Sequence, residues 1–83
     1  MELKETVELM NSMNYKDRFL AEYAQAKIRY AKLWNMVIKY KAGTLDFVPS
    51  CSLELLVEQL RAMGNYIMIL ETRAEVENIS LKE

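Results

Sequence analysis

The chain has 83 residues, of which 52% are hydrophobic, with a formal net charge of −1, one cysteine and no histidine. A chain of this length has room for one domain, and it buries too little apolar surface to be stable without a disulfide, a metal ion or self-association. Because Cys51 has no second cysteine to pair with and the common zinc sites need histidine or several cysteines, self-association is the stabilising device that remains. We therefore expect a homo-oligomer.

Residues 1–13 are expected to form a short N-terminal helix, with Leu3, Val7 and Met10 on one face. This segment lacks the basic region and apolar stretch of a signal peptide. Elsewhere no apolar run approaches the roughly 18 residues of a membrane span. A single thiol also suits a reducing compartment. The sequence thus predicts a cytoplasmic protein with no membrane partner.

Residues 14–83 are expected to form an antiparallel αα-hairpin, with arms at about 15–42 and 52–78 and a loop at 43–51. In the first arm, apolar side chains three and four positions apart define one helical face: Phe19, Tyr23, Ala26, Tyr30, Leu33, Val37 and Tyr40. In the second arm the same spacing joins Leu53, Leu56, Leu60, Met63, Ile67, Leu70 and Ala74. Two arms of similar length and a short connection are typical of this motif, so the fold class is all-α.

The ends of the arms carry helix-boundary signals. Asn14 can cap the first arm with Asp17 in its first turn, and Gly43 can end it in a left-handed turn. The N-cap of the second arm is open among three residues: Ser50, Cys51 and Ser52.

Each arm has a second apolar line, which a two-helix hairpin cannot bury. In the first arm this line comprises Leu20, Ala24, Ala31, Trp34 and Ile38. In the second arm it comprises Leu55, Ala62, Tyr66, Ile69 and Val76. These lines must meet the N-terminal helix, another chain or both, which again favours a homo-oligomeric helical bundle.

Catalytic and metal-binding motifs are absent from the sequence. There is no histidine to act as a base, no glycine-rich phosphate loop and no serine or cysteine in a nucleophile motif. Glutamates one turn apart occur at Glu54 and Glu58 and at Glu71 and Glu75, but the metal motif of helical bundles also needs Glu-x-x-His. We interpret these pairs as solvated faces and expect a protein that is not an enzyme and holds no metal or cofactor.

The charge is unevenly divided between the arms. Residues 14–43 carry seven Lys and Arg side chains against two acidic ones, and residues 51–79 carry two against five. The two arms could attract one another, or the basic face could meet an anion such as a nucleotide phosphate. A pI near 5.5 disfavours duplex nucleic acid as a partner.

Aromatic side chains alternate with these basic ones, as in surfaces that stack bases and hold phosphates. Antiparallel pairing brings Arg73 near Phe19 and Leu20 at the open end, close to Asp17, where it can form an ion pair or contact a phosphate. The candidate ligand-binding residues are Tyr15, Tyr23, Lys27, Arg29, Tyr66 and Arg73. Alternatively, the tyrosines belong to the helix seam and the charges face solvent.

Gly64 interrupts the second arm at a cost of up to about 1 kcal/mol relative to alanine. Close approach of a neighbouring helix explains this glycine most simply, and room for a ligand is the alternative.

From Tyr15 to Ile79 the chain resembles a family of short, mostly uncharacterised proteins of tailed phages of gut bacteria. The residues that carry the likeness include Tyr15-Lys16-Asp17-Arg18, the loop Ala42-Gly43-Thr44-Leu45-Asp46-Phe47, and Leu70-Glu71 with Arg73-Ala74-Glu75. That family is similar in layout to the helical hairpin of viral sponge proteins, which assemble through their hairpins and sequester nucleotide signals of antiviral defence between subunits.

The resemblance implies a phage-encoded, non-enzymatic anti-defence protein in the host cytoplasm. It would sequester a cyclic oligonucleotide or other nucleotide signal between subunits. The alternatives are a protein–protein inhibitor or regulator resembling an anti-CRISPR, and a small structural phage protein with no ligand.

Overall fold

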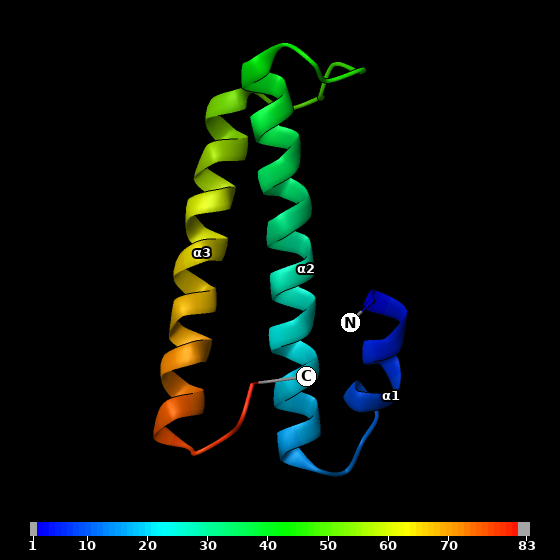
Figure 1. The fold of residues 1–83 in the computed structure, drawn as a ribbon, viewed down its shortest axis with the longest axis vertical. Helices are drawn as coiled ribbons and strands as arrows, with labels where there is room; N and C mark the ends of the chain where they lie inside the picture. Colours follow the sequence, from blue (N-terminus) through cyan, green and yellow to red (C-terminus); the bar gives the residue numbers. More distant parts are fainter. Residues whose placement is uncertain (1, 82–83) are drawn as a thin grey trace.

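The computed structural model describes residues 2–81, which form helices and connecting turns without a strand. The elements are a 3-10 turn, η1 (Leu3–Glu5), and the helices α1 (Thr6–Met10), α2 (Tyr15–Ala42) and α3 (Leu53–Val76). Helices α2 and α3 pack against each other in antiparallel directions, and α1 lies on the other side of α2 (Figure 1). The predicted all-α fold with a helical hairpin is confirmed.

Helix α2 begins and ends where its capping residues predict. The Asn14 side chain accepts a hydrogen bond from the backbone N–H of Lys16 at 2.8 Å. Gly43 adopts φ 77°, a left-handed conformation that glycine takes without steric cost. The next N–H, that of Thr44, donates to the Lys39 carbonyl at 2.9 Å. The helix therefore ends at Gly43, where the chain turns into the loop.

Helix α3 is capped by Ser52, whose hydroxyl accepts a hydrogen bond from Leu55 N–H at 3.2 Å. It ends at Val76, two residues before the predicted position 78. Asn78 then takes a positive φ of 57°, and the N–H of Ile79 donates to the carbonyl of Ala74 at 2.8 Å. This turn folds the last described residues back onto the hairpin (Figure 1).

The main hydrophobic cluster lies at the open end of the hairpin. It comprises Phe19, Leu70, Ala74 and Ile79, with Leu20, Tyr23, Ala26 and Leu81 packed around it. Leu70 is completely buried. Ile79 belongs to this cluster because the turn after α3 returns it to the helix pair.

The explanation of Gly64 by close helix approach is supported by the packing of Tyr30. A Cβ atom added at Gly64 would lie 3.3 Å from Cε1 of Tyr30. This distance is shorter than an ordinary van der Waals contact, so the absence of a side chain on α3 lets the tyrosine ring of α2 lie against the α3 backbone.

Helix α1 packs on α2 through a polar residue. The sequence predicts Leu3, Val7 and Met10 on one face, and of these Val7 and Met10 are exposed. Thr6 is fully buried instead, and its hydroxyl donates to the Leu3 carbonyl at 2.6 Å and accepts from Gln25 Nε2 at 2.8 Å. With both hydrogen-bonding capacities satisfied, a threonine can occupy this position at little cost.

The second apolar lines of the two arms remain largely exposed within one chain. Trp34 is 46% exposed on α2, and Ile69 is 47% exposed on α3. Of the residues in these lines, Ala24 alone is buried. None of the helices formed by residues 2–81 has both the length and the apolar character that crossing a bilayer requires.

Candidate ligand interface

Arg73 lies at the open end of the hairpin in contact with the start of α2, as the antiparallel pairing predicts. Its Cζ is 5.1 Å from the centroid of the Phe19 ring, and its Nη2 donates to the Tyr15 hydroxyl at 2.9 Å. Its Nε lies 3.4 Å from the Glu77 carboxylate, to which Tyr15 also donates at 2.7 Å. These contacts hold the guanidinium between the Phe19 ring and the Tyr15 hydroxyl at the protein surface.

The ion pair of Arg73 is formed with Glu77, the residue that follows α3, and not with Asp17, the carboxylate that the sequence places nearby. Asp17 instead accepts a hydrogen bond from the Ser12 hydroxyl at 2.9 Å, which ties it to the connection before α2. The hydrogen bond to Glu77 raises the pKa of the Tyr15 phenol, and the hydrogen bond to Tyr15 raises the pKa of the Arg73 guanidinium. Both groups therefore keep their protons at neutral pH.

Tyr23 and Lys27 form a second group one turn apart on α2. The Tyr23 hydroxyl donates to Glu71 of α3 at 2.7 Å, and the Lys27 ammonium lies 5.8 Å from the centroid of the Tyr23 ring. Burial, reinforced by the hydrogen bond to Glu71, raises the pKa of Tyr23 to about 12. Lys27 is exposed, so its charge is available at the surface.

These two groups lie on opposite sides of the helix pair. Glu71, which contacts Tyr23, and Arg73 are two residues apart on α3, or about 200° around the helix. Tyr66 precedes Arg73 by two turns and shares its side. Tyr66 and Lys27 therefore lie on different sides of the hairpin.

The helical period likewise assigns Arg29 to the Tyr15 side of α2, because 14 residues span nearly four complete turns. Arg29 is exposed. One side of the hairpin thus carries four of the six predicted residues, namely Tyr15, Arg29, Tyr66 and Arg73, and the other side carries Tyr23 and Lys27. The six residues therefore do not form one surface on a single chain.

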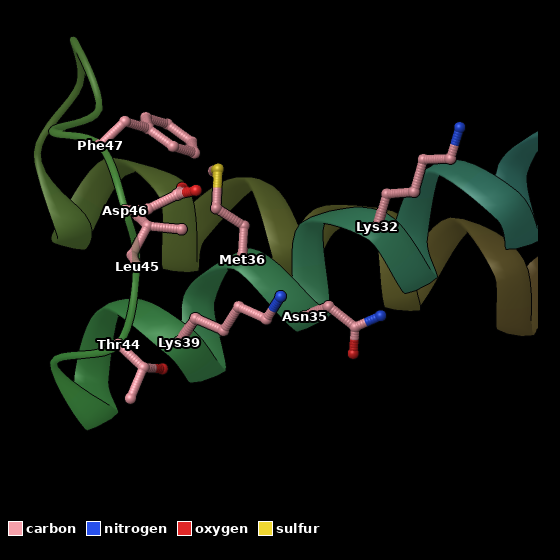
Figure 2. Close-up of a pocket in the computed structure, with 8 residues that line it drawn as sticks. All are labelled: Lys32, Asn35, Met36, Lys39, Thr44, Leu45, Asp46 and Phe47. Atoms are coloured by element: carbon pink, nitrogen blue, oxygen red, sulfur yellow. The ribbon is translucent and has the colours of Figure 1, made fainter.

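A further recess, which the sequence analysis did not identify, lies where the loop folds back against α2. Its volume is about 330 Å³, and the residues that line it are Lys32, Asn35, Met36, Lys39, Thr44, Leu45, Asp46 and Phe47. Figure 2 shows Phe47 and Asp46 on the loop side and the Lys39 side chain running along α2 in the direction of Asn35. The sequence signal that could have identified this recess is the spacing of Lys32 and Lys39, two turns apart on one helical face, together with an aromatic residue in the loop.

The chemistry offered by these surfaces is that of binding. They present ammonium and guanidinium groups, aromatic rings and amide or carboxylate hydrogen-bonding groups. Within residues 2–81 there is no cluster of three or more His, Cys, Asp or Glu side chains that could hold a metal ion.

Comparison with known protein families identifies the family of this hairpin. Residues 13–76, which contain all of α2 and α3, match the model of the Sequestin family. No curated protein and no solved structure matches the chain. Since the matched segment covers well over half of the sequence, the chain belongs to the Sequestin family.

Proposed function

We propose that this protein is a phage-encoded, non-enzymatic sponge that sequesters a nucleotide signal of antiviral defence between subunits in the host cytoplasm. The family name indicates sequestration of a ligand, and so a binding function in place of catalysis. The ligand class rests on the resemblance to phage proteins and viral sponges, and on the basic and aromatic character of α2.

The observation that carries the proposal is the arrangement around Arg73. A guanidinium held over the Phe19 ring and hydrogen-bonded to Tyr15 is oriented before any ligand arrives, which lowers the entropic cost of binding a phosphate. The Tyr15 ring is exposed beside it and offers a flat face for a base.

Assembly of subunits is part of the same proposal. The candidate residues occupy two sides of one chain, and exposed apolar side chains such as Trp34 and Ile69 lie on the same helices. Packing one hairpin on another would cover these side chains and bring a Tyr23–Lys27 surface of one subunit toward a Tyr15–Arg73 surface of the next.

Titration calorimetry against cyclic dinucleotides, cyclic trinucleotides and ADP-ribose tests the ligand class. We expect at least one of them to bind and to be recovered unchanged after the complex is heated. Arg73→Glu and Arg29→Glu should each weaken binding by about tenfold or more, since a charge-assisted hydrogen bond is lost and a repulsion is added. Arg61→Glu, the same reversal at another exposed position of α3, is the matched control.

A wild-type protein that binds no member of the panel would overturn the proposal. Recovery of a linear or dephosphorylated product would instead overturn its non-enzymatic part. Binding that is equally strong in all three variants would leave a nucleotide-binding protein whose site lies elsewhere.

A protein–protein inhibitor is the second candidate, and the exposed apolar residues favour it. Met68 and Val76 of α3 and Val48 of the loop are exposed side chains of the kind found at protein interfaces. Absence of nucleotide binding, combined with capture of one defined host protein that Val76→Asp abolishes, would support this function.

A further inference from the structure

We propose that the recess between the loop and α2 is a nucleotide-binding subsite, in which Lys32 and Lys39 hold phosphate and Phe47 stacks on the base. This inference rests on the proposed function, because it assigns a second contact region to the same class of ligand. It concerns a surface outside the six residues discussed above.

The position of the recess follows from the reversal at Gly43. The left-handed turn there sends residues 44–47 back alongside the last turns of α2, on the side where α1 packs further down (Figure 1). The stretch of α2 from Lys32 to Lys39 therefore lies between the loop and α1. The lining of the recess includes side chains from both α2 and the loop (Figure 2).

Two cations favour an anionic ligand in this recess. Lys32 and Lys39 are both exposed, and the ion pair that the structure defines within residues 2–81 joins Arg73 to Glu77 and involves neither lysine. Their spacing of seven residues sets them about 10 Å apart along the helix axis. A diphosphate or two phosphates of one ligand can span such a distance, whereas a single phosphate contacts one lysine at a time.

The remaining lining favours a nucleotide over an inorganic anion. Phe47 is 54% exposed although it is aromatic, and its ring borders the recess opposite α2 (Figure 2). Stacking on an aromatic ring stabilises a bound base, because every base has a flat π-face. The Asp46 carboxylate beside it would repel a phosphate but can accept hydrogen bonds from ribose hydroxyls or from an amino group of a base.

The geometry thus assigns different parts of the ligand to different ends of the recess. Phosphates lie toward α2 with the lysines, and the base and ribose lie toward the loop with Phe47 and Asp46. The Asn35 side-chain amide, which can donate as well as accept, lies between the two lysines in sequence and can bridge the two parts.

Calorimetry with ADP-ribose and with inorganic pyrophosphate tests this assignment. The Lys32→Gln/Lys39→Gln double variant should bind both probes at least about tenfold more weakly, because each charge-assisted hydrogen bond contributes about 1.4 kcal/mol or more. Phe47→Leu should weaken ADP-ribose binding by a similar factor and leave pyrophosphate binding unchanged. Lys41→Gln, which removes an exposed charge from the same end of α2 outside the recess, is the matched control.

Amide chemical shifts of the folded wild type locate the ligand independently of the variants. On addition of ADP-ribose, the largest changes should fall on Asn35 and on residues 44–47. Changes confined to the Tyr15 and Arg73 region, with full affinity in the recess variants, would overturn the inference and leave the proposed function standing. Absence of any heat or shift with ADP-ribose and pyrophosphate would overturn the inference, and absence of binding by every nucleotide of the panel would overturn the proposed function as well.

Discussion

The two ends of the α2–α3 hairpin differ in how their apolar side chains are covered. At the open end, Phe19, Leu70 and Ala74 are buried in a cluster to which the turn after α3 adds Ile79. At the loop end Val37 and Leu56 are buried between the helices, but no further helix is present among the described residues and the neighbouring Leu55 is 53% exposed. A helix pair alone buries one face of each helix, so extra segments or a second chain decide the stability of each end.

Replacement of one leucine at each end tests this difference most strongly. Leu70→Ala should lower the free energy of unfolding by about 2–5 kcal/mol, since it leaves a cavity in a completely buried position. Leu55→Ala removes the same atoms from a position that is 53% exposed within one chain, and at concentrations where the subunits are dissociated it should change the free energy of unfolding by less than about 1 kcal/mol. Denaturant unfolding measures both values, and equal losses would show that the two ends are equally well covered.

Self-association should cover the exposed side chains of the loop half. We expect Trp34→Asp to weaken the association of subunits by about 2 kcal/mol or more, because buried tryptophans dominate many interfaces. Asn35→Asp places the same charge on the neighbouring exposed residue and should have a smaller effect. Light scattering of the wild type as a folded monomer at micromolar concentrations would contradict this expectation.

The open end also depends on a polar link between the helices. Tyr23→Phe removes the hydrogen bond to Glu71 and should lower the free energy of unfolding by about 1 kcal/mol at neutral pH. Because the pKa of Tyr23 is about 12 when folded and near 10.0 when unfolded, its contribution is full below pH 10 and is lost as the pH rises toward 12. The melting temperature should therefore fall more steeply between pH 8 and 11.5 for the wild type than for Tyr23→Phe. Parallel curves of melting temperature against pH would contradict this pKa.

A substitution in the middle of the hairpin should change the free energy of unfolding least. Alanine at position 64 improves helix propensity by up to about 1 kcal/mol, but its Cβ would press on the Tyr30 ring. Gly64→Ala should therefore stabilise the wild type by less than this amount. In a Tyr30→Ser background, where the ring is absent, the same substitution should yield the full gain. Identical gains in both backgrounds would show that the ring moves aside freely.

Local signals in the sequence were sufficient to predict the hairpin. Apolar side chains three and four residues apart mark the packed face of each arm, and Asn14 and Gly43 mark the ends of α2. The register followed from antiparallel pairing, which correctly placed Arg73 against Phe19. These features depend on neighbouring residues and on one helix–helix contact, so they can be inferred without tertiary detail.

Features that depend on how the chain folds back could not be predicted in this way. The inward face of α1 is set by the two hydrogen bonds of Thr6, and a hydrophobic pattern favours Val7 and Met10 instead. Arg73 pairs with Glu77 while its guanidinium lies over the Phe19 ring, and the choice of Glu77 over Asp17 depends on where the side chains lie in the folded chain. The contact between Arg73 and Tyr15 follows from the antiparallel register of the two arms. The recess at the loop could not be predicted in this way, because it depends on the path of residues 44–47.

The buried hydroxyl of Thr6 has a consequence for the alignment of α1 on α2. An apolar contact tolerates sliding, but the Thr6 hydroxyl has its Gln25 partner at one position only. Displacement of α1 by a single turn would leave a buried donor or acceptor unsatisfied, at a cost of about 1–3 kcal/mol. The hydrogen bond therefore fixes the position of α1 along α2. With α1 fixed there, the part of α2 from Lys32 to Lys39 remains available to line the recess at the loop.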